Sequence, residues 1–185
     1  FTRHLIGAAP QATAMDIDYA DFDNDGDFDI LSTDFEEYEI YWYENDGNQS
    51  FIRHTVASLD SPQAIEAADV DHDGDMDILG ASWGHNKIML YSNDGNQNFS
   101  AAAVDTNVSN ARDVITVDLN NDDRLDVAGI SFGDNSLKTW INTTSYYDIG
   151  ATELKPNATL EGRVFHDING DGQAKWSTHF DFNED

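Results

Sequence analysis

The chain has no cysteine, and its nine lysine and arginine residues stand against 36 aspartates and glutamates. The absence of cysteine excludes disulfide bonds and thiolate metal sites. A formal net charge of −27 is the wrong sign for binding nucleic acid or an anionic membrane surface. No apolar run approaches the roughly 18 residues that a membrane-spanning helix needs. The many acids therefore need another explanation.

Apolar residues are present in amounts that suit a folded core. They make up 39% of the 185 residues, and aromatic residues make up 11%, which argues against disorder. The first residue is Phe1 rather than methionine, and no signal-peptide pattern follows it. We therefore expect a processed or excised piece of a precursor.

One acidic stretch recurs along the chain. It reads DFDNDGDFD at 21–29, DVDHDGDMD at 69–77 and DLNNDDRLD at 118–126, and a weaker version, DINGDGQAK, begins at Asp167. The four starts lie 48, 49 and 49 residues apart. A period near 49 residues indicates a repeat architecture in which each repeat is one supersecondary unit.

Each repeat is expected to contribute four short strands. In the second repeat, the apolar runs predict strands near 64–70, 76–83, 87–93 and 99–105, separated by turn signals such as Asn-Asp-Gly. Runs such as YEIYWYEN carry large apolar residues on both strand faces, which suits sheets covered on both sides, as in propeller blades. The sequence therefore predicts an all-β protein of propeller-type, four-stranded antiparallel blades. About three blades would be followed by a partial fourth or by the start of a β-sandwich module.

The acidic stretch has the chemistry of a loop for a hard cation. Oxygen-bearing side chains at the first, third and fifth positions and an acid at the ninth suit an ion with six to eight oxygen ligands. Gly26, Gly74 and Asp123 hold the sixth position, where a sharp turn favours residues that tolerate positive φ. An EF-hand would need a glutamate at position 12, where the three copies have serine or glycine. We predict three calcium sites and a fourth, weaker one.

The three loops, each leading into a strand, resemble FG-GAP/VCBS repeats, as found in the β-propeller of integrin α subunits and in bacterial surface proteins. The resemblance covers about residues 1–150, although the Phe-Gly pair itself survives only at Phe132-Gly133. It implies side-chain ligands at the first, third, fifth and ninth positions and a backbone carbonyl at the seventh. The implied metal-binding residues are Asp21, Asp23, Asp25, Asp27 and Asp29, then Asp69, Asp71, Asp73, Asp75 and Asp77, and then Asp118, Asn120, Asp122, Arg124 and Asp126.

The C-terminal part departs from this pattern. We assign residues 1–156 to FG-GAP/VCBS-like repeats, and residues 157–185 to a diverged fourth repeat or to the start of a module that resembles SdrD B-like β-sandwiches. The fourth loop would bind through Asp167, Asn169 and Asp171. Because Lys175 stands at its ninth position, this loop is the weakest candidate site.

Two serine motifs raise the question of catalysis. Ser82 in GASWG and Ser131 in GISFG fit the G-x-S-x-G nucleophile elbow, which needs a helix directly after the strand. Both serines occupy one position in successive repeats and no helix is predicted, so a structural role explains them better. Most carboxylates suited to glycoside hydrolysis already belong to the acidic loops. We predict no enzyme activity, and three tryptophans are expected on strands in the core: Trp42, Trp83 and Trp140.

Five Asn-x-Ser/Thr triplets fall mainly at hairpins and strand ends, where a glycan has room. The glycosylation candidates are Asn48, Asn98, Asn107, Asn142 and Asn157.

An acidic, cysteine-free, calcium-loaded protein is expected outside the cell, where calcium-binding modules work at high free calcium. Closed propellers typically need about four to eight blades, so the chain would be a fragment, a subunit completed by neighbours, or an open array. We predict a secreted or cell-surface protein with a structural or adhesive role, whose partners are other protein subunits, surface ligands or its own copies. The alternatives are the non-catalytic propeller portion of a secreted hydrolase and a lectin-like module that binds glycans.

Overall fold

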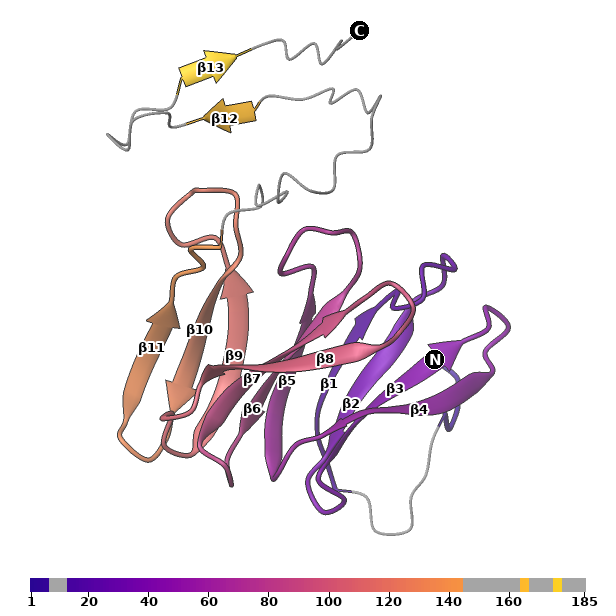
Figure 1. Ribbon diagram of the computed structural model, residues 1–185. Helices are drawn as coiled ribbons and strands as arrows, with labels where there is room; N and C mark the ends of the chain where they lie inside the picture. The colour runs from indigo at the N-terminus through magenta and orange to yellow at the C-terminus, as the bar shows by residue number, and fades with distance from the viewer. Residues whose placement is uncertain (7–12, 145–163, 167–174, 178–185) are drawn as a thin grey trace, which may run out of the picture. The chain divides into compact units, whose positions relative to one another are not determined.

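The computed structural model describes residues 1–6 and 13–144, and the backbone of residues 164–166 and 175–177. The chain divides into two compact units, Phe1–Thr144 and Ser145–Asp185. Every regular element in the described parts is a β-strand, which confirms the predicted all-β class (Figure 1). None of the described residues forms a helix that is long and apolar enough to cross a membrane. The predicted boundary near residue 157 falls outside the described residues.

Three antiparallel sheets, which we call the first, second and third blades, make up the unit Phe1–Thr144. The first blade contains β1 (Ala14–Ala20), β2 (Asp29–Asp34), β3 (Glu39–Asn45) and β4 (Phe51–Ser58). The second contains β5 (Pro62–Ala68), β6 (Asp77–Ser82), β7 (Lys87–Asn93) and β8 (Phe99–Asp105). The third contains β9 (Ala111–Val117), β10 (Asp126–Ser131) and β11 (Ser136–Trp140). Neighbouring strands of each sheet follow one another in sequence.

The repeat prediction is confirmed in its main terms. The four strands of the second blade lie within two residues of the predicted ranges. The third blade has three strands in the part of the chain that the structure describes. The repeat spacing places the position of a fourth strand after Thr144, outside the described residues. In the second unit, β12 (Val164–His166) pairs with β13 (Lys175–Ser177), and His166 lies opposite Lys175. Ala68 lies opposite Asp77 at the matching repeat positions of the second blade.

Both faces of β6, in the second blade, are buried because a neighbouring blade covers each of them. All six residues of β6 are buried. Ile78 packs with Leu31 and Ile40 of the first blade, whereas Leu79 on the opposite face packs toward the third blade around Val127. Ile78, Leu79, Leu31 and Ile40 have no exposed surface. The core of this unit therefore lies at the interfaces between blades. Burial of each such side chain contributes about 1.5–3 kcal/mol to the free energy of folding.

Acidic side chains join the first strand of each blade, here called its innermost strand, to that of the next blade: β1 to β5 and β5 to β9. Asp16 accepts a hydrogen bond from the backbone amide of Ile65 (3.0 Å), and Asp18 accepts one from that of Ala67 (2.8 Å). Glu66 accepts from both the backbone amide and the hydroxyl group of Thr116 (2.8 and 2.6 Å). β5 and β9 are edge strands, so these carboxylates satisfy amides that no strand pairs with.

The serine and tryptophan predictions had mixed outcomes. Ser82 and Ser131 are fully buried, and their hydroxyl groups donate to the carbonyl oxygens of Asp60 (2.6 Å) and Ser109 (2.7 Å), which supports a structural role. Trp42 is 5% exposed in β3, as predicted. The placement of Trp83 on a strand is wrong, because this residue lies half-buried in the turn after β6. Trp140 ends β11 and packs partly buried against the core.

The contact of Glu66 with Thr116 gives a test of the packing between blades. We expect Glu66→Ala to lower the free energy of unfolding by about 1–3 kcal/mol, because it leaves the Thr116 amide without its acceptor. Equilibrium unfolding in urea measures this change. Glu66→Gln keeps an acceptor oxygen and should lose less, and Glu36→Ala, an exposed acid, should cost less than about 0.5 kcal/mol. Equal losses for Glu66→Ala and Glu36→Ala would contradict the role of this contact.

Candidate metal centre

Each of the three described acidic loops curls around the carboxylate at its first position. In the first loop, Asp21 accepts hydrogen bonds from the backbone amides of Asp25 (3.1 Å) and Gly26 (3.0 Å). Asp118 does the same in the third loop, with the amides of Asp122 and Asp123 (3.2 and 3.1 Å). The sixth position has positive φ in each of the three described loops, as predicted, with values of 97° at Gly26, 97° at Gly74 and 63° at Asp123.

The carboxylate at the ninth position anchors the loop inside its blade. Asp77 is fully buried at the start of β6, and it accepts hydrogen bonds from the backbone amides of Val70 (3.0 Å) and Asn93 (2.9 Å). Asp29 and Asp126 make the matching pair of bonds and are also fully buried. The sequence indicated a ligand at this position. It did not reveal the second bond, which reaches the end of the third strand 16 residues later.

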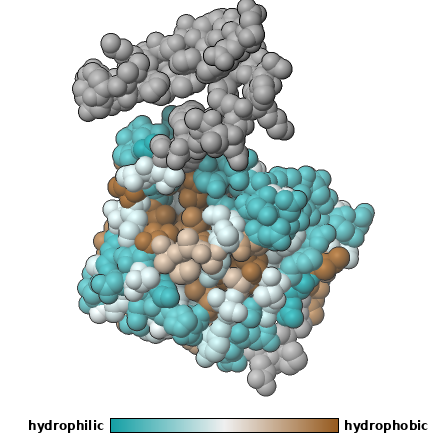
Figure 2. All heavy atoms as spheres, in the orientation of Figure 1, coloured by the Kyte–Doolittle hydropathy of each residue, from teal (hydrophilic) through white to brown (hydrophobic). Residues whose placement is uncertain are grey.

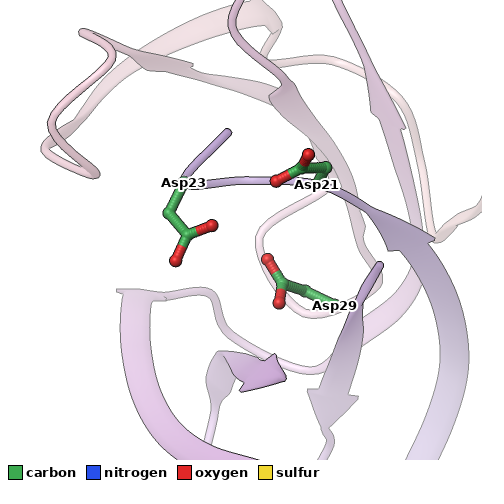
Figure 3. Close-up of side chains that lie close together, drawn as sticks. All are labelled: Asp21, Asp23 and Asp29. Atoms are coloured by element: carbon green, nitrogen blue, oxygen red, sulfur yellow. The ribbon is translucent and has the colours of Figure 1, made fainter. Parts of the chain in front are cut away.

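The first, third and ninth positions bring three carboxylates together in each of the first two loops. The ligand atoms of Asp21, Asp23 and Asp29 lie within 4.8 Å of one another, and their carboxylates turn toward a common space (Figure 3). Asp69, Asp71 and Asp77 form the same group in the second loop. In the third loop the third position is Asn120, so its oxygen donors there include an amide in place of a carboxylate.

These groups are electrostatically strained without a cation. Burial first, and neighbouring carboxylates second, raise the pKa of Asp71 above its usual value. Burial also raises the pKa of Asp23, and it raises that of Asp77 to about 6. One carboxylate oxygen of Asp69, Oδ1, is buried without a hydrogen-bond partner. A buried acceptor with no donor is costly, and a metal ion among the three carboxylates would remove that cost. The residues therefore fit a hard cation.

The side chain at the seventh position points away from this group. Alanine in place of Gly47 or Gly95, in the hairpins that follow, would put its Cβ against the carboxylate of Asp27 or Asp75, respectively. Asp75 also accepts a hydrogen bond from the side-chain amide of Asn24 in the first loop (2.7 Å), which links neighbouring loops. This placement fits a seventh position that offers an ion only its carbonyl group.

The fifth position is outside the two carboxylate groups of the described residues. Asp25 and Asp73 each accept a hydrogen bond from the backbone amide two residues later, at 2.9 Å. In the third loop Asp122 also pairs with the guanidinium group of Arg124, whose Nε donates to the carbonyl oxygen of Asn142 (3.0 Å). A cationic side chain thus stands beside the third loop. Direct binding of an ion by the fifth position stays a prediction.

Other predicted sites lie partly outside the described residues. Asp167, Asn169, Asp171 and the glycosylation candidate Asn157 belong to that undescribed part. Asn48, Asn98 and Asn107 are exposed, and Asn142 is half-buried. The amide groups of Asn48 and Asn98 donate to Asp46 and Asp94 within their own hairpins.

A comparison with known families decides the identity of these loops. The FG-GAP-like repeat family matches residues 21–80 and 69–129, and each match runs from one acidic loop through the next. The chain belongs to the FG-GAP-like repeat family. No curated protein matches it. Each FG-GAP match joins the loop of one blade to the loop and second strand of the next, so the matched unit spans the interface between blades.

The raised pKa of Asp77 predicts how the calcium-free protein responds to pH. The folded-state pKa of about 6 lies above the unfolded-state value of about 4. The stability from this group is therefore fully present below about pH 4 and is lost as the pH rises through about 6. In the presence of a chelator, we expect a higher melting temperature at about pH 5 than at about pH 7.5.

Asp77→Asn is the control for this experiment, because it removes the titrating group. A general relief of charge repulsion would leave the pH dependence of the variant as steep as that of the parent, whereas a contribution from Asp77 makes the variant less pH-dependent. A parent protein that melts at a lower temperature at the lower pH would contradict the assignment.

Proposed function

We propose that the chain is a calcium-stabilised, extracellular repeat protein with a structural or adhesive role and no catalytic activity. The observation that carries the proposal is that two clusters of three carboxylates lie at matching positions of successive blades. In the second cluster, Oδ1 of Asp69 is buried and has no hydrogen-bond donor. Oxygen donors alone suit Ca²⁺ better than transition metals, which favour nitrogen or sulfur ligands.

The ion would be held by the side chains at the first, third, fifth and ninth positions and by the carbonyl group at the seventh. Three divalent ions would change the formal net charge from −27 to −21, since each adds two positive charges. Their local effect is larger than this total, because each ion would lie among carboxylates that otherwise repel one another at short range. Ion binding would therefore contribute directly to the free energy of folding.

The extracellular assignment is supported by the family and by the loop chemistry. FG-GAP repeats are typical of extracellular proteins and are generally non-catalytic. The two serines in nucleophile-elbow motifs are buried and donate to backbone carbonyls, which does not suit a nucleophile. A repeat that depends on calcium for its fold suits a compartment rich in that ion. The surfaces of such blades would then serve contacts with other proteins.

A recess among the starts of β1, β5 and β9 makes glycan binding a second candidate function. It has a volume of about 430 Å³, and its lining includes Phe35, Glu36, Trp83 and Arg112. Aromatic rings beside planar polar groups suit a sugar. However, the ring of Trp83 already has Phe132 at 5.4 Å and the Arg112 guanidinium at 5.8 Å. Binding on a glycan array that is lost in Trp83→Ala would support this role.

Calcium removal tests the main proposal. We expect a chelator to lower the melting temperature by more than about 10 °C, because the loops lose the cation that neutralises their carboxylates. Circular dichroism or calorimetry, with calcium added back as the control, measures the change. An unchanged melting temperature at low ionic strength would overturn the calcium proposal.

Single substitutions in the second loop test which residues bind the ion. Removing the carboxylate of Asp71 or Asp73 should weaken calcium binding at that site at least about tenfold, or about 1.4 kcal/mol, because a charged ligand is lost. Asp75→Ala should change it by less than about threefold, since that side chain faces Gly95 and Asn24. Calorimetric titration of the three variants measures these affinities. Equal losses in all three would mean that the order of ligands is wrong, and a silent Asp73→Ala would exclude the fifth position.

A further inference from the structure

The blade at each end of the described array leaves one face open. We propose that the open face of the third blade docks on the open face of the first blade of a second copy of this chain, head to tail. The proposal deepens the structural role proposed above by naming its partner. Its geometric basis is independent of the metal ions. It rests on repeat positions that are buried wherever a neighbouring blade is present.

The face of the third blade that points away from the second blade is unusually exposed. Ile40 and Ile88 hold one position on β3 and β7 and have no exposed surface, but Leu137 at the same position of β11 is 74% exposed. The residue that follows the first position of each acidic loop shows the same change: Phe22 in the first blade is 0% exposed, whereas Leu119 in the third blade is 44% exposed. Apolar residues are visible among hydrophilic ones on the side that carries β9 and β10 (Figure 2). A shallow hollow lined by Ile115, Ile130 and Leu137 lies on this face.

The first blade has the complementary open face. Ile65 and Val114, at one position on β5 and β9, are 5% and 3% exposed, because the preceding blade covers them. Ile17 at that position of β1 is 67% exposed. Tyr19 and Phe28 extend this face at 60% and 66%, with their rings in edge contact at 5.3 Å. One chain thus carries both halves of an interface that it already forms twice internally.

A polar contact on the third blade is incomplete in the same way. Asp16 of the first blade uses one carboxylate oxygen for the amide of Ile17 (2.9 Å) and the other for the amide of Ile65 in the next blade (3.0 Å). Asp113 holds the matching position of the third blade, and its Oδ1 accepts from the amide of Val114 (3.0 Å). No donor among the described residues reaches its Oδ2. Repetition of the internal contact would bring the amide of Ile17 of the second copy, which within its own chain donates to Asp16 (2.9 Å), toward this oxygen.

The charge of the chain sets the conditions for this association. Two copies that each carry −27 repel one another, and salt at physiological strength screens that repulsion beyond about 8 Å. The faces themselves are mainly apolar, so their burial supplies the attraction. The contact is heterologous, since different faces meet, and it therefore builds rings or open filaments rather than symmetric pairs.

Sedimentation velocity of the full chain, with calcium and physiological salt, is the test. The parent chain should form species larger than the monomer at micromolar concentration. Leu137→Asp and Ile17→Asp should each be monomeric, and both should melt within a few degrees of the parent because these side chains are exposed already. Ile52→Asp, at a residue 56% exposed on β4 and outside both faces, should associate like the parent.

A mixture of the two monomeric variants separates head-to-tail docking from other contacts. Leu137→Asp retains an intact first-blade face and Ile17→Asp an intact third-blade face, so an equal mixture should give a dimer and nothing larger. A mixture that stays monomeric, or an Ile52→Asp variant that dissociates, would overturn the proposal. So would a monomeric parent chain, for instance one whose third-blade face is covered by its own residues 145–185. If the melting temperature of that monomer still depended on calcium, the calcium proposal would stand.

Discussion

The buried aspartate at the ninth loop position is the contact on which the rest of each blade depends. Asp29, Asp77 and Asp126 each start a second strand with no exposed surface. Each accepts one amide from its own loop and one from the end of the third strand or, for Asp126, from Asn142 just after it. A carboxylate has two acceptor oxygens and can serve both amides at once, whereas an asparagine has one. Three segments of a blade therefore meet at a single side chain.

The same carboxylate couples the fold to the ion. Asp29 and Asp77 contribute to the two groups that could hold a metal, so a cation there would act on the residue that joins the loop to the second and third strands. Without a cation, burial holds the pKa of Asp77 near 6, and the folded state bears an electrostatic cost at neutral pH. The third blade differs because Arg124 brings a guanidinium group beside Asp122. That blade carries part of its counter-charge in its own sequence.

The sequence predicted the features that depend on local chemistry. The 49-residue period located the blades, the strands of the second blade fell within two residues of expectation, and the sixth loop position has the expected positive φ. Contacts between residues about 50 positions apart were not predicted. Asp18 and Glu66 look like ordinary solvent-facing acids in a strand, because only the stacking of blades brings them to the amides of Ala67 and Thr116. Trp83 was misplaced because β6 ends one residue earlier, at Ser82, and its neighbours Phe132 and Arg112, which come from the next blade, were not predicted either.

Those long-range acids explain how one blade follows another without strand pairing. The innermost strand of every blade is an edge, and unpaired edges invite association with any exposed strand. Here a side chain from the preceding blade occupies amides of that edge, as Asp16 does for Ile65. The acids that give the chain its large negative charge thus have two separate uses, in the loops and along the inner strands. Because the acceptor comes from the preceding blade in each of these contacts, the contact has a direction. In the third blade, Asp113 holds the matching acceptor position, and no following blade is present among the described residues.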